Sequence, residues 1–203
     1  LGSMVEVESE KVDDSTGRAK ASRIRFGSEI VGPVASVDTT NSNFVVLDQT
    51  VDVKPETVFD DSLAGGLAAL TGKVVEVHAQ LDAATGHYVA TRVEAEVGAT
   101  AFKLRGVVSA LDATAKTFKI GAAVINYGSV AAADLPAGLA DGLKVRVKLQ
   151  TAQVDGHWVA TAIGGGVKRL EDRAEAHLRG AVTLFTSATD FELNGVKVDA
   201  SAA

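Results

Sequence analysis

Residues 32–44 read Gly-Pro-Val-Ala-Ser-Val-Asp-Thr-Thr-Asn-Ser-Asn-Phe, and this pattern returns twice further along the chain. A glycine, alternating apolar residues, a polar turn and a phenylalanine occur again from Gly106 to Phe118 and from Gly180 to Phe191. Successive glycines of the pattern are 74 residues apart. Self-similarity at a fixed interval indicates a chain built from copies of one structural unit.

A second block marks the later part of each unit. It reads Asp-Ala-Ala-Thr-Gly-His-Tyr-Val-Ala-Thr-Arg-Val at 82–93 and Val-Asp-Gly-His-Trp-Val-Ala-Thr-Ala-Ile at 154–163. A weaker copy, Asp-Asp-Ser-Thr-Gly-Arg-Ala-Lys-Ala-Ser-Arg-Ile, occupies 13–24. We therefore expect two complete units, at 29–97 and 104–166, each able to fold by itself.

The apolar pattern inside one unit is mostly that of strands. Alternation over Val34–Asp38, an apolar run from Phe44 to Leu47, and then Val51 and Val53 predict three strands. The segment Leu63–Leu70, with its counterpart Leu135–Leu139, has the apolar spacing of a short helix.

Two further strands are predicted at the end of the unit, on either side of a turn at Gly86. Three strands, a short helix and two strands in about 70 residues is the order of the OB-fold, a five-stranded Greek-key barrel. The expected fold class is all-β, with tandem small OB-like barrels that each carry one short helix.

Half units flank the two complete ones. Residues 4–28 correspond to the last two strands of a unit and residues 178–203 to its first three, while 167–177 is predicted to be a linker helix. The halves are complementary, so they are expected to form a third barrel within one chain or between chains, unless each belongs to a neighbouring unit. Loop-closure cost favours pairing within one chain. The residues predicted to carry this strand complementation are Val5, Val7, Ile24, Val182, Phe191 and Leu193.

Four segments of the first unit carry a resemblance to a known family. They are Gly-Pro-Val-Ala-Ser-Val-Asp at 32–38, Phe-Val-Val-Leu at 44–47, Gly-Lys-Val-Val-Glu-Val at 72–77 and Ala-Thr-Arg-Val-Glu at 90–94. Their pattern resembles a bacterial family of exported, tandemly repeated domains of unknown function, over nearly the whole chain from Met4. The resemblance implies an exported β-repeat protein without known activity. The second unit departs from it at Ala162, where the first has Arg92.

Composition restricts the possible partners. The net charge of −6, from 26 acidic and 20 basic residues, disfavours a general phosphate-backbone binder, so no nucleic acid partner is expected. No apolar run approaches the roughly 18 residues of a membrane span. The leading Leu-Gly-Ser looks like the remnant of a removed fusion tag, so the start of the chain carries no information about a signal peptide. A periplasmic or extracellular location is expected from the family resemblance alone.

Two aromatic residues stand at equivalent positions just after a glycine turn, in His87-Tyr88 and His157-Trp158. Rings in such a place can stack a sugar or a base, as they do in many OB-folds. The interpretation we favour is that they seal one end of each barrel, because large rings close a small core efficiently.

Catalytic and metal-binding patterns do not emerge from the sequence. The four histidines have none of the close spacings of a zinc site, and the aspartates of Asp60-Asp61 and Asp82 are better explained by turns. We expect no enzyme, no metal and no cofactor.

The predicted function is a non-enzymatic exported scaffold or protein-interaction module that self-associates by strand complementation. The alternative is a carbohydrate- or oligonucleotide-binding module, with a polysaccharide as a possible partner, that uses His87, Tyr88, His157 and Trp158.

Overall fold

The computed structural model describes residues 5–13, 18–26, 28–165, 182–193 and 196–199. The chain divides into two units, Leu1–Val167 and Lys168–Ala203. The described residues form strands and short 3₁₀ helices. No helix among them is both long and apolar enough to span a membrane.

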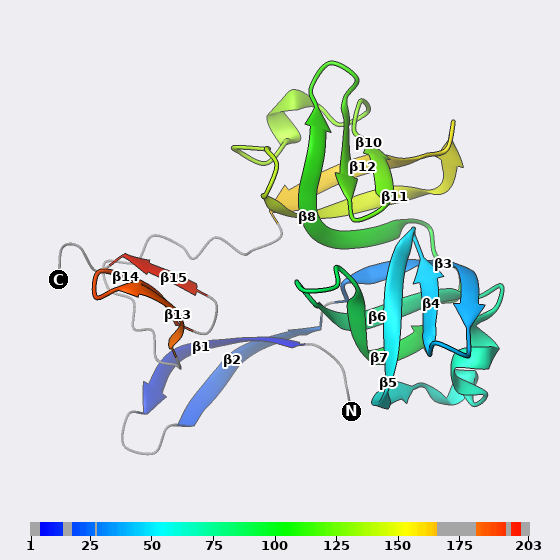
Figure 1. The fold of residues 1–203 in the computed structure, drawn as a ribbon, viewed down its shortest axis with the longest axis horizontal. Helices are drawn as coiled ribbons and strands as arrows, with labels where there is room; N and C mark the ends of the chain where they lie inside the picture. Colours follow the sequence, from blue (N-terminus) through cyan, green and yellow to red (C-terminus); the bar gives the residue numbers. More distant parts are fainter. Residues whose placement is uncertain (1–4, 14–17, 27, 166–181, 194–195, 200–203) are drawn as a thin grey trace. The chain divides into compact units, whose positions relative to one another are not determined.

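The first barrel is a closed sheet of five strands (Figure 1). Its strand order is β3-β4-β5-β7-β6, and β6 pairs back onto β3 to close the barrel. The β5–β7 pair is parallel and the others are antiparallel. The strands are β3 (Ile30–Asp38), β4 (Asn43–Val46), β5 (Gln49–Phe59), β6 (Val74–Leu81) and β7 (Tyr88–Ala95).

The second barrel repeats this topology. Its order is β8-β9-β10-β12-β11, with β10–β12 parallel and β11 closing onto β8. The strands are β8 (Phe102–Asp112), β9 (Thr117–Ile120), β10 (Ala123–Asn126), β11 (Lys144–Val154) and β12 (His157–Gly165). The predicted all-β class of small OB-like barrels is confirmed.

The connection between the third and fourth strands differs from the expected helix. In the first barrel it contains two 3₁₀ helices, η1 (Asp61–Leu63) and η2 (Gly66–Leu70), because Gly66 has a φ of 59° that an α-helix does not accept. In the second barrel η3 (Ala132–Asp134) precedes the predicted segment, where Pro136 and Gly138 interrupt a helix. The apolar spacing predicted helical turns correctly but overestimated their length.

The repeated glycines, Gly32 and Gly106, lie where the first strand of each barrel packs closely against a core side chain. The first half of β3 pairs with β6 and its second half with β4. A Cβ atom added at Gly32 would overlap the side chain of buried Leu47, and one added at Gly106 would overlap Ile120. Only glycine allows the strand to bend this closely over the core.

The two complete barrels share one continuous core. Ile30 and Val31 of β3 pair with Leu104 and Lys103 of β8, and the buried apolar residues of both barrels form a single cluster. Strand pairing and apolar burial thus cross the junction, and the independent folding of the two units stays a prediction.

Two smaller sheets complete the described chain. One is the hairpin of β1 (Val5–Asp13) and β2 (Arg18–Phe26). The other contains β13 (Val182–Ser187), β14 (Asp190–Leu193) and β15 (Val196–Asp199). Their joining into a third barrel stays a prediction, and the linker helix predicted at 167–177 lies outside the described residues.

We expect Gly32→Ala to lower the free energy of unfolding by about 1–3 kcal/mol, because its new methyl group overpacks Leu47. The matched control is Gly164→Ala in β12, where an added Cβ meets nothing within 4 Å. Urea denaturation measures both. Equal stability of the two variants would contradict the proposed close packing at Gly32.

Candidate functional site

Tyr88 and Trp158, the rings predicted from the sequence, occupy matching places in the two barrels. Tyr88 of β7 lies beside Val51 and Trp158 of β12 beside Ile125, in the parallel pair of each barrel. Tyr88 is 2% exposed and Trp158 is 7% exposed. Neither ring presents a free face, so their burial gives no support to a role in stacking a ligand.

Each ring is instead hydrogen-bonded to the other barrel. The Tyr88 hydroxyl donates to the carbonyl oxygen of Arg105 over 2.6 Å, and Trp158 Nε1 donates to Asp48 Oδ2 over 2.8 Å. Phe102 packs edge-on against Trp158, with 5.9 Å between the ring centroids. The rings thus seal the barrel ends against each other.

A buried glutamine adds a third link across the junction. Gln49 is 3% exposed, and its Nε2 donates to the carbonyl oxygens of Ile120 at 2.8 Å and Leu47 at 3.1 Å. Ala123 stands at the matching position of the second barrel, so the second barrel makes no equivalent side-chain contact with the first. Sequence reasoning missed Gln49, although a polar residue where the repeat has alanine was an available signal.

An ion pair lies next to the Tyr88 hydroxyl. Arg105 Nη1 is 3.3 Å from Glu29 Oε1, and the Arg105 backbone N–H donates to the Glu29 carbonyl over 2.8 Å. Burial, together with the charge of Glu29, raises the pKa of Tyr88 to about 12, while Arg105 acts in the opposite direction. Tyr88 therefore stays a neutral hydrogen-bond donor at physiological pH.

The two histidines of the predicted site lie at the surface in different surroundings. His87 Nδ1 is 3.2 Å from Asp52 Oδ1. In the second barrel Asn126 occupies the place of Asp52, and its Oδ1 accepts the Gly128 backbone N–H over 2.8 Å. The carboxyl group of Asp52 is thus replaced by a neutral amide in the second barrel.

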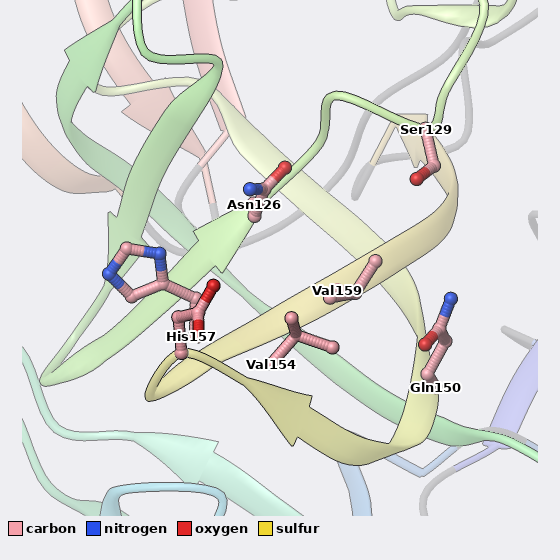
Figure 2. Close-up of a pocket in the computed structure, with 7 residues that line it drawn as sticks. Asn126, Ser129, Gln150, Val154, His157 and Val159 are labelled. Atoms are coloured by element: carbon pink, nitrogen blue, oxygen red, sulfur yellow. The ribbon is translucent and has the colours of Figure 1, made fainter.

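A shallow hollow of about 290 Å³ lies beside His157. Figure 2 shows Asn126 on β10 and His157 and Val159 on β12 around it. The full lining is Asn126, Ser129, Gln150, Val154, Asp155, His157 and Val159. Two of these residues, Asp155 and His157, are titratable, and the others are polar or apolar.

A charged cluster that the sequence analysis did not single out lies on β6 and β7. His78 is 3% exposed, and its Nε2 is 3.4 Å from Glu94 Oε2, while Arg92 Nη2 is 2.8 Å from Glu94 Oε1. The Arg92 hydrogen bond is the main cause that lowers the pKa of Glu94. Arg92 and Glu94 belong to the Ala-Thr-Arg-Val-Glu segment, which was the signal for them. At the matching positions, the second barrel has Lys148, Ala162 and Gly164.

The turn aspartates act as predicted. Asp82 accepts the backbone N–H of Ala84, and Asp60 accepts both the N–H and the hydroxyl of Ser62. These hydrogen bonds hold the pKa of Asp82 and of Asp60 below the usual range. Within the described residues, no three His, Asp or Glu side chains converge on a possible metal position.

The β1–β2 hairpin has the same register as the last two strands of the complete barrels. Its pairing shifts between Glu8 and Ser9, as it shifts between His78 and Ala79 in β6 and between Lys148 and Leu149 in β11. Val7 pairs with Ile24 just before this bulge. The predicted complementation residues of this half, Val5, Val7 and Ile24, thus lie on a hairpin of the expected kind.

The β14–β15 hairpin matches the second and third strands of a barrel. Phe191 pairs with Val198, as Phe44 pairs with Val51 and Phe118 with Ile125. Phe44 and Phe118 are 0% exposed, whereas Phe191 is only partly buried. Val182 and Leu193 pair with each other where β13 meets β14.

Comparison with known protein families gives a match within the first barrel. Residues 31–94 match a domain of unknown function, DUF5666. The DUF5666 segment holds all four sequence segments on which the family resemblance rests, together with the His78–Arg92–Glu94 cluster. Neither the curated proteins nor the solved structures gave a match.

The buried Tyr88 hydroxyl in the DUF5666 barrel predicts how the stability of the fold changes at high pH. The folded-state pKa of Tyr88, about 12, lies above the usual value of 10.0, so the neutral ring contributes stability that is complete below pH 10 and lost as the pH rises through about 12. Absorbance titration at the phenolate band should show ionisation near pH 12. That step should be absent from Tyr88→Phe. An unchanged titration in this variant would contradict the assignment.

The hydrogen bond of Trp158 to the DUF5666 barrel can be measured with a double-mutant cycle. We expect a coupling of about 1–3 kcal/mol between Trp158→Phe and Asp48→Gly, because Asp48 is a charged acceptor and glycine tolerates its φ of 58°. The control cycle pairs Trp158→Phe with Ser42→Gly, another turn residue of positive φ. Equal coupling in the two cycles would refute the cross-barrel bond.

Proposed function

We propose that this protein is a non-enzymatic, exported scaffold built from OB-like repeats, which assembles by strand complementation. The observation that carries the proposal is the set of registers in the two smaller sheets. The β1–β2 hairpin and the β13–β15 sheet together supply the five strands of one barrel, with the bulge and the phenylalanine pairing of the complete barrels.

The exposure of two phenylalanines supports the proposal that the β13–β15 sheet takes a partner. Phe185 is 67% exposed and pairs with Phe191. The matching pair in the first barrel is Val37 with Phe44, in which Val37 packs on the core and Phe44 is 0% exposed. A two-stranded hairpin by itself is also marginally stable in water, so both parts gain from joining.

The complete barrels predict how the pieces pair. Their third strand pairs in parallel with the fifth, Val51 with Tyr88 and Ile125 with Trp158. By the same register, Val198 of β15 is expected beside Ala19 of β2. The next pair then brings Asp199 beside Lys20, two residues of opposite charge.

Several ionisable side chains of the complete barrels have partners of the kind that hold structure together. His78 is held by Glu94, His87 by Asp52, and the turn aspartates by backbone N–H groups. Export is proposed from the family resemblance, whose sequence segments lie in the DUF5666 region. Pairing within one chain is favoured by loop closure, while pairing between chains joins copies head to tail.

The predicted register can be tested with cysteines, because the chain has none of its own. In an Ala19→Cys, Val198→Cys double variant, mild oxidation should form a disulfide, since neighbouring strands lie about 4.8 Å apart and fit disulfide geometry. Non-reducing electrophoresis separates the two routes. A compact monomer indicates pairing within one chain, and a ladder of oligomers indicates pairing between chains.

The control is Arg25→Cys with Val198→Cys, which moves the first cysteine six residues along β2, a distance of about 20 Å. This pair should cross-link much more slowly. If both double variants give the same yield of disulfide, or neither forms one, strand complementation is wrong.

A further inference from the structure

The second barrel carries a row of cations on its outer face. Along β8 and β11 these cations alternate with buried apolar residues such as Leu104 and Val147, so they point away from the core. We call this surface the basic face; it consists of Lys103, Arg105, Lys144, Arg146 and Lys148. Four of them are exposed and Arg105 is half-buried.

Like charges stand directly opposite each other on the basic face. Lys148 pairs with Lys103, and Arg146 pairs with Arg105. Such cross-strand pairs are destabilising. Edge protection, the usual structural reason for lysines on strands, does not apply, because β11 is paired on both sides, with β8 and with β12. Folding alone therefore does not account for these residues.

The first barrel shows that the fold does not require this charge. The matching register positions there hold two acids, two valines and a histidine. They are Glu29, Val31, Val74, Glu76 and His78. Val31 and His78 are buried and the other three are partly buried, so the first barrel has no exposed row of cations at these positions. The exposed cations of the second barrel are therefore not a requirement of the fold and are open to a role in binding.

Most of the positive charge is available to a ligand. Arg105 is paired with Glu29, whereas Lys103, Lys144, Arg146 and Lys148 form no ion pair with any described residue. A hollow begins at Lys148, and hydroxyl and amide side chains border it. Its lining is Thr100, Ala101, Lys148, Leu149, Gln150, Thr151, Ala152 and Thr161.

This combination favours an acidic polysaccharide over a nucleic acid. Single-stranded nucleic acids are held by exposed aromatic rings on which the bases stack, but Phe102 of β8 and Trp158 of the neighbouring strand β12 are buried. Hydroxyl and amide groups beside the cations suit sugar hydroxyls.

We propose that the basic face binds an acidic polysaccharide whose repeating units carry carboxylate groups. The cations form a grid of about 4.8 Å across the strands and about 6.8 Å along them, so one chain of carboxylates contacts several cations. Thr151 and Thr161 extend the surface with hydroxyl groups for the sugar ring. This site is independent of the proposed strand complementation.

Isothermal titration of the full chain with polygalacturonate tests the proposal. We expect saturable binding that weakens as salt is added, and no binding of the fully methyl-esterified polymer, which keeps the sugars and loses the charge. Arg146→Gln with Lys148→Gln should weaken binding about tenfold, as expected for the loss of two exposed ionic contacts. The control, Lys54→Gln with Lys119→Gln, removes the same charge outside the basic face and should bind like the original protein.

Three results would overturn the proposal. They are the absence of binding, equal weakening in both double variants, and tighter binding of single-stranded DNA than of polygalacturonate at the same salt concentration. The last result would assign the basic face to nucleic acid instead. Circular dichroism and thermal melting of each variant verify that a loss of binding is not a loss of fold.

Discussion

The first strand of each barrel has to pair with two neighbours at once, and the closed structure depends on this. In β3 the pairing changes from β6 to β4 near Gly32, and in β8 it changes from β11 to β9 near Gly106. Neither glycine has room for a side chain over the core. Closure removes the edges that an open five-stranded sheet would expose, and it places the fifth strand in parallel beside the third.

That parallel pair positions the junction between the barrels. It places Tyr88 and Trp158 at matching sites, from which each ring reaches the neighbouring barrel and donates a hydrogen bond. Gln49 adds a buried polar contact with good geometry, and the β3–β8 pairing joins the backbones. Buried and satisfied polar contacts of this kind favour one arrangement of paired strands and side chains at the junction.

Because the two barrels have the same topology, each position of one can be compared with the matching position of the other. At the same register positions, one has the His78–Arg92–Glu94 cluster and the other has Lys148, Ala162 and Gly164. Phenylalanines that both barrels share, Phe44 and Phe118, belong to the core, whereas the positions that differ include buried ones, such as Gln49 and His78, and exposed ones, such as Lys148. The exposed differences are the most direct indication of function, because packing constrains the buried positions and leaves the outer faces free.

The sequence by itself determined the repeated unit, the strand order and the turns. These features rest on local patterns: alternation of apolar residues, glycine where the backbone needs it, and aspartate where a turn needs an acceptor. The tertiary structure alone decided that the two barrels share a core, that Tyr88 and Trp158 are buried between them, and that Gln49 and the cations of β8 and β11 have their present neighbours. Contacts such as Gln49 with Ile120 join residues 71 positions apart, and which of them meet depends on barrel closure and register. A local pattern carries no information about either, and for this reason the sequence could favour rings that seal the barrel ends without showing that Tyr88 and Trp158 also link the two barrels.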